Sequence, residues 1–156
     1  MKNQKVYLKF FAITLLLSLL QTNFFNILLN FPVPILVFAF SLALLSLDDL
    51  EYAYFSAFIG GLFLDFLGEG LLGRTSIVFV LFLLLVFYIK KYIFDSLFLY
   101  VLSCIAFSLV WEFLFFPKTS HIQWVFMLFN FLTFVIFYYL LKKFEFSKRD
   151  KITSHF

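Results

Sequence analysis

Three ionisable side chains lie within or beside long apolar segments of this chain: Asp65, Arg74 and Glu112. Carboxylates near a guanidinium group can form a structural ion-pair cluster, or they can line a pathway for protons or ions. We favour the structural cluster, because an ionisable group in an apolar environment needs a partner. Asp65→Asn and Glu112→Gln separate the two interpretations. A pathway predicts lost transport in an intact protein, whereas a structural pair predicts poor folding or accumulation.

Small residues precede Asp65 at intervals of four, and two more lie beside them: Ala53, Ala57 and Gly61, with Ser56 and Gly60. On a helix this spacing forms one side that another helix can approach closely. The first interpretation is packing between helices of this same chain, which we favour. The second is a surface that docks the helix of a partner protein.

The glycines of the chain all lie between residues 60 and 73. Gly68, Gly70 and Gly73 come just before Arg74, and they predict a tight turn with several positive φ angles. This turn does not have the spacing of a phosphate-binding loop. We expect it to bring Arg74 towards Asp65 and Glu112.

A second polar stripe repeats every four residues through Tyr100, Cys104, Ser108 and Glu112. Four amides lie on the outer part of the first apolar segment: Gln21, Asn23, Asn26 and Asn30. They can form hydrogen bonds to neighbouring helices, which we favour, or line a wet cavity. The sequence has no Ser-His-Asp set, no paired-histidine metal motif and no CxxC motif. It therefore predicts no enzymatic activity, no metal site and no cofactor.

The composition determines which elements position these residues. Of the 156 residues, 64% are hydrophobic and 13% are charged, whereas soluble domains have about 25% charged residues. We therefore expect an all-α integral membrane protein with one polytopic domain and about six transmembrane helices. The runs lack the alternation of an outer-membrane barrel. The expected spans are 7–29, 34–47, 51–67, 75–89, 96–116 and 122–141.

The basic residues predict the orientation of these spans. With six spans and a cytoplasmic N-terminus, ten of the 12 Lys and Arg residues fall inside, and Arg74 and Lys118 fall outside. Both termini are then cytoplasmic, and residues 144–156 form a polar tail that is disordered or lies on the membrane surface. The positive charges lie at the ends of the spans, where they set the topology. The net charge of +3 therefore does not indicate a nucleic-acid partner.

The segment from Phe58 to Gly68, FIGGLFLDFLG, followed by Gly70-Leu71-Leu72-Gly73, resembles the signature of the rod-shape-determining MreD family. That family carries a GLxxD helix end, a turn of small residues, and an LG pair that opens the next helix. The sequence match covers about residues 57–74, and the span pattern is similar over most of the chain. The acidic Asp48-Asp49 loop departs from the family, in which a basic residue is more usual.

The resemblance implies a non-enzymatic component of the cell-wall elongation complex in the bacterial cytoplasmic (inner) membrane. Such a protein docks the single transmembrane helix of an MreC-like coiled-coil protein. It contacts the RodA–transpeptidase synthase and the MreB cytoskeleton indirectly, and it contacts membrane lipid. The family fold is similar to that of the substrate-binding subunits of energy-coupling-factor transporters. The alternative function is therefore such a vitamin-binding subunit, with Asp65, Arg74, Trp111 and Glu112 lining its pocket.

Overall fold

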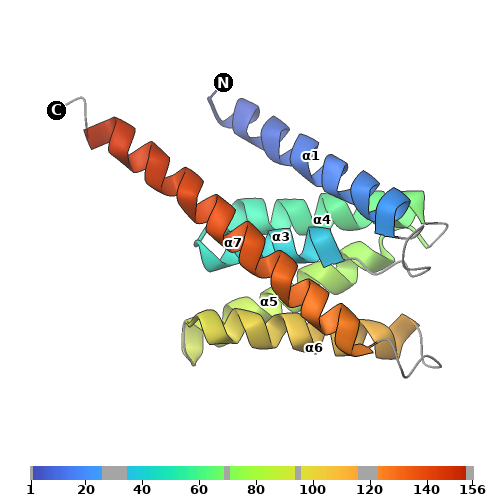
Figure 1. Ribbon diagram of the computed structural model, residues 1–156. Helices are drawn as coiled ribbons and strands as arrows, with labels where there is room; N and C mark the ends of the chain where they lie inside the picture. Colours follow the sequence, from blue (N-terminus) through green and yellow to red (C-terminus); the bar gives the residue numbers. More distant parts are fainter. Residues whose placement is uncertain (1, 26–34, 69–70, 94–95, 116–122, 154–156) are drawn as a thin grey trace.

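The computed structural model describes residues 2–25, 35–68, 71–93, 96–115 and 123–153, and these residues form helices and turns without a strand. An all-α fold is therefore confirmed for this part of the chain. Figure 1 shows the helices in chain order: α1 (Lys2–Leu20), the π-helical turn η1 (Gln21–Phe25), α3 (Ile35–Ser46), α4 (Leu50–Leu67), α5 (Arg74–Tyr92), α6 (Leu97–Phe115) and α7 (Gln123–Thr153).

The short helix α3 forms the centre of the bundle. It packs against α1, α4, α5, α6 and α7, and every residue from Val37 to Leu45 is at most 2% exposed. A helix that is apolar on all sides is expected to be buried on all sides. The Phe38 ring of α3 stacks on Phe107 of α6 and is tilted against Phe79 of α5, and Phe79 meets Phe107 edge-on. These rings fill the space between the three helices.

The other helices surround α3 in two groups. Helices α4 and α5 form a closely packed antiparallel pair, and α1 packs on α4. On the other side, α7 packs against α3 and α6, and in Figure 1 it crosses in front of them. The N-terminal end of α1 and the C-terminal end of α7 point to the same side of the bundle (Figure 1).

Among the described residues, three helices are long and apolar enough to cross a membrane: Val6–Asn23, Leu50–Leu67 and Arg74–Tyr92. The apolar helices Leu36–Ser46 and Leu97–Trp111 are shorter. These findings are compatible with a multi-pass membrane protein, and the count of six spans stays a prediction. Helix α3 has 12 residues and is therefore about 18 Å long, less than the hydrocarbon core of about 30 Å.

The observed helices follow the expected segments closely, except at the two termini. The first expected segment reaches residue 29, and its last residues lie outside the described part of the chain. The last one was expected to end at residue 141, but α7 continues to Thr153. Much of the expected tail, 144–156, is therefore helical, because residues 142–153 contain neither glycine nor proline to end the helix.

Candidate functional site

The small residues that precede Asp65 are all buried on α4, together with Asp65 itself. We call this set the small-residue face; it consists of Ala53, Ser56, Ala57, Gly60, Gly61 and Asp65. It packs against α1, α3 and α5 of the same chain. The structure thus uses this face for internal packing, the first of the two interpretations of its spacing.

At Gly61, α4 and α5 approach each other closely. A Cβ atom at Gly61 would lie 2.5 Å from the Cα and 2.6 Å from the backbone nitrogen of Ser76. The Ser76 hydroxyl donates a hydrogen bond of 2.9 Å to the carbonyl oxygen of Phe58. Because backbone atoms occupy the space beside Gly61, any larger side chain forces the two helices apart.

Gly60 lies against side chains of α3 and α1. A Cβ atom there would contact Val37 and would lie 2.8 Å from Cγ2 of Thr14. One turn earlier, the hydroxyl oxygens of Ser56 and Ser41 lie 2.8 Å apart and share a hydrogen bond. Small polar side chains thus join α4 to α3 in a region where larger ones would not fit.

Asp65 caps the start of α5. Its side chain is 6% exposed, and its two carboxylate oxygens lie 3.0 Å and 3.2 Å from the backbone nitrogen of Thr75, which donates to them. Thr75 lies in the first turn of α5, where backbone N–H groups have no partner within the helix. A carboxylate at this position also interacts favourably with the positive end of the helix dipole.

The turn between α4 and α5 is partly as expected. Gly73 has a φ of +89° and precedes the first residue of α5, Arg74. Gly68 ends α4 with a φ of −106°, so it does not supply a second positive φ angle, and Gly70 lies outside the described residues.

The predicted charge cluster is described only in part. Arg74 is exposed. Glu112 lies on α6, but its side chain is outside the described part, so the cluster of Asp65, Arg74 and Glu112 stays a prediction.

The polar stripe on α6 is an internal contact with α7. Tyr100, Cys104 and Ser108 are all buried. The side-chain amide of Asn130 donates to the Cys104 carbonyl oxygen at 3.1 Å and to the Ser108 hydroxyl at 2.9 Å. Asn130 was not among the residues predicted to join helices. Asn130 is a single amide in a long apolar run. This pattern could have indicated a contact between helices, because a buried amide in a membrane helix needs a partner.

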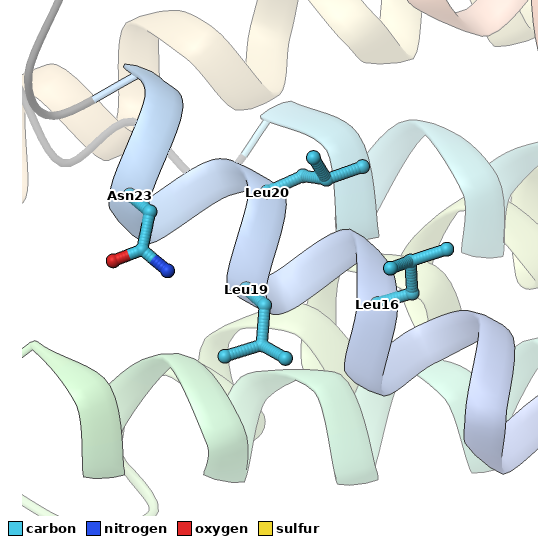
Figure 2. A pocket seen from close by; sticks show the side chains of 4 residues that line it. All are labelled: Leu16, Leu19, Leu20 and Asn23. Atoms are coloured by element: carbon cyan, nitrogen blue, oxygen red, sulfur yellow. The ribbon is translucent and has the colours of Figure 1, made fainter.

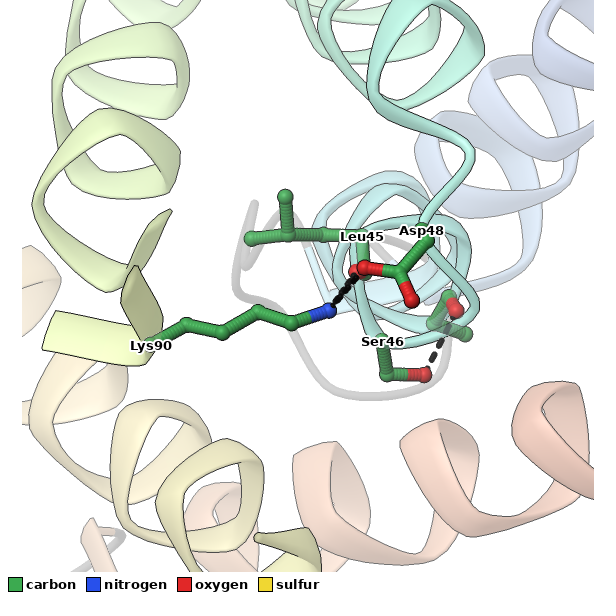
Figure 3. A network of polar contacts seen from close by, with 5 residues as sticks. Leu45, Ser46, Asp48 and Lys90 are labelled. Carbon is green, nitrogen blue, oxygen red and sulfur yellow. Dashed lines mark hydrogen bonds and ion pairs between the residues drawn. The ribbon is translucent and has the colours of Figure 1, made fainter. Parts of the chain in front are cut away.

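Both ends of α3 are also capped by side chains from other helices. At its start, the Gln21 side-chain oxygen accepts the backbone N–H of Leu36 at 2.9 Å. At its end, the Lys90 ammonium group donates to the Leu45 carbonyl oxygen at 3.3 Å and pairs with Asp48 (Figure 3). In a bilayer the ends of so short a helix need partners from neighbouring helices. The Gln21 contact agrees with the predicted role of this amide between helices, whereas the contact of Lys90 with α3 was not predicted.

The acidic turn after α3 is held by the same contacts. The Lys90 ammonium nitrogen lies 2.5 Å from the Asp48 carboxylate, and Asp48 has a φ of +64°. The Tyr7 hydroxyl on α1 donates to the Glu51 carboxylate at 2.8 Å. Of the Asp48-Asp49 pair that departs from the MreD pattern, Asp48 is therefore bound within this chain, to Lys90 of α5.

The outer side of α1 carries a shallow groove. Its lining consists of Leu16, Leu19, Leu20 and Asn23 (Figure 2), and the three leucines are 57%, 37% and 47% exposed. Asn23 is also exposed, and none of the described residues forms a hydrogen bond with its side chain. The groove combines apolar surface with one amide that can accept and donate hydrogen bonds.

Within the described residues, no group of three or more His, Cys, Asp and Glu side chains could hold a metal ion. The groups that are brought together serve to cap helix ends and to join helices. Comparison with known protein families, with curated proteins and with solved structures finds no match to this chain. The resemblance to MreD therefore rests on the residues of segment 57–74.

Proposed function

We propose that this chain is a non-enzymatic component of the bacterial cell-wall elongation complex, related to MreD, which docks the single transmembrane helix of an MreC-like protein. In this role it links the RodA–transpeptidase synthase and the MreB cytoskeleton indirectly. The observation that carries the proposal is the α4–α5 hairpin. The residues of the MreD-like segment join α4 to the start of α5, because Gly61 lies against Ser76 and the Asp65 carboxylate accepts the backbone N–H of Thr75.

The docking surface we propose is the groove on α1, not the small-residue face. The small-residue face is buried among helices of this chain, so a partner helix would have to separate α4 from α5 to reach it. The groove instead presents exposed leucines and the amide of Asn23. In lipid, apolar side chains alone provide little reason to associate, whereas an amide gains a hydrogen bond from a partner helix.

The vitamin-binding alternative expects a pocket lined by Asp65 and Trp111. In this structure Asp65 is engaged by the backbone of Thr75. The Trp111 ring is 5% exposed and packs against Phe79 and Phe107. Because both side chains take part in packing and capping, the described residues favour a scaffold over a ligand-binding subunit.

Purification of the tagged full chain from its native membranes tests this proposal. We expect a coiled-coil protein with one transmembrane helix to co-purify. Leu16→Trp and Asn23→Ala should each reduce its recovery, because one fills the groove and the other removes the amide. Leu81→Trp on α5 is the matched control, since Leu81 is 60% exposed and lies outside the groove.

Two results would contradict the proposal in different ways. A co-purifying vitamin or ATPase module would support the transporter alternative and reject the role in cell-wall elongation. Normal recovery of the coiled-coil partner with both groove variants would reject the groove but leave the role intact. Thermal unfolding of each purified variant distinguishes lost docking from a misfolded chain.

A further inference from the structure

Two groups of lysines and tyrosines far apart in the sequence lie at the same end of the bundle. The Lys90 ammonium group lies 5.9 Å from the ring centre of Tyr100, and Tyr100 stacks on Phe134 of α7 at 6.1 Å. Phe134 stacks on Tyr138, over whose ring the Lys142 ammonium group lies at 5.5 Å. This row of contacts connects the end of α5, through α6, to the middle of α7.

At this end, α5 and α7 each carry exposed lysines and tyrosines. We call these residues together the lysine–tyrosine surface, and they are Tyr88, Lys91, Tyr92, Tyr139, Lys142 and Lys143. The Lys91 ammonium group lies 5.2 Å from the ring centre of Tyr92. Lys142 also donates to the Tyr138 hydroxyl at 3.4 Å. Lys90, by contrast, is turned inward and already paired with Asp48, so it is not included in the surface.

The exposed sides of both helices change in character in the same order along their length. On α5, the exposed residues Ile77, Leu81 and Leu85 lead to Tyr88 and then Lys91. On α7, the exposed residues Leu128, Leu132 and Ile136 lead to Tyr139 and then Lys143. Apolar, aromatic and cationic side chains in this order match the hydrocarbon, interfacial and headgroup layers of a bilayer leaflet.

We propose that the lysine–tyrosine surface binds the phosphate groups of anionic phospholipids. The lysines supply positive charge and hydrogen-bond donors at headgroup depth, and their alkyl stems extend along apolar surface. The tyrosine hydroxyls supply further donors to phosphate oxygens. A lipid fits better than free phosphate, because the exposed apolar residues that adjoin the surface on both helices can contact acyl chains. This inference is independent of the proposed partner.

The test uses the full chain in a neutral detergent, into which dioleoyl phosphatidylglycerol or dioleoyl phosphatidylcholine is titrated. The rise of the thermal unfolding midpoint gives an apparent affinity for each lipid. We expect the wild type to be stabilised by phosphatidylglycerol and much less by phosphatidylcholine. Lys91→Gln, Lys142→Gln and Lys143→Gln should each lower the apparent affinity about fivefold, and the triple variant about 100-fold.

Arg74→Gln is the matched control, because Arg74 is an exposed cation at the opposite end of α5; its variant should keep the full response to phosphatidylglycerol. About 0.5 M sodium chloride should weaken the response of the wild type. Three outcomes would overturn the proposal: equal stabilisation by the two lipids, a triple variant that responds like the wild type, or equal stabilisation by inorganic phosphate.

Discussion

The α4–α5 pair is closed at each end by a charged side chain that meets the terminus of a helix. At one end, the Asp65 carboxylate accepts the backbone N–H of Thr75, at the start of α5. At the other, the Lys90 ammonium group donates to the Leu45 carbonyl oxygen, at the end of α3. The charges of these two side chains agree with the helix dipole, which favours anions at the start of a helix and cations at its end.

The two ends differ in how they are surrounded. At the Asp65 end, Asp65 is 6% exposed, Ser76 is fully buried, and Gly61 leaves no room for a side chain. At the Lys90 end, the lysine side chain is 9% exposed, but its partner Asp48 is 80% exposed. We infer that close backbone packing and a buried cap stabilise the first end, whereas an ion pair open to solvent contributes to the second.

The largest expected effect is at the close contact of the Asp65 end. Gly61→Leu should destabilise the fold by about 3 kcal/mol or more, because its side chain would overlap the backbone of Ser76. Unfolding of the purified protein by titration with a denaturing detergent measures this change. Phe58→Leu on the same helix is the control, since Phe58 is 49% exposed. A midpoint equal to that of the wild type would reject the close approach of α4 and α5.

The cap at the Asp65 end comes next. Asp65→Ala should cost about 2 kcal/mol, because the N–H group of Thr75 loses its buried acceptor. Asp65→Asn keeps one acceptor oxygen and should cost about half as much. The same unfolding titration separates these variants. If Asp65→Asn keeps its stability but abolishes ion flux in proteoliposomes, the transport interpretation replaces the structural one.

The smallest effects are expected at the Lys90 end, and they should depend on salt. Lys90→Met should cost about 1.5 kcal/mol, because it removes the donor from the end of α3. Asp48→Asn should cost no more than about 0.5 kcal/mol, since its carboxylate is exposed. Salt screens an exposed pair, so about 0.5 M sodium chloride should reduce the effect of Asp48→Asn. An Asp48→Asn effect as large as that of Asp65→Ala would contradict the difference between the two ends.

Helix positions could be predicted well wherever the sequence interrupts its apolar runs. Helix α3 was expected over 34–47 and spans Ile35–Ser46, and α4 was expected over 51–67 and spans Leu50–Leu67. Prolines, glycines and charged residues at these breaks end helices for local reasons. Helix α7 continues past the expected end of the last span at residue 141, because charged helix formers follow Leu141 and polarity alone does not end a helix.

The candidate site could be predicted in part. The spacing of Ala53, Ala57 and Gly61 indicated a side of α4 that a helix approaches closely, but it did not identify the helix. Asn130 and Lys90 were missed because their partners, Cys104 and Leu45, offer backbone carbonyl groups. Every residue has such a group, so sequence patterns do not mark the ones that a side chain reaches.

The sequence by itself determined that the chain is helical and apolar, where its helices break, and which side of α4 consists of small residues. These properties depend on neighbours within a few positions along the chain. The tertiary structure decided that this side meets α5, that Asp65 caps α5, and that Gln21 and Lys90 cap the two ends of α3. These contacts join residues on different helices, and they depend on how the helices cross, which local spacing does not determine.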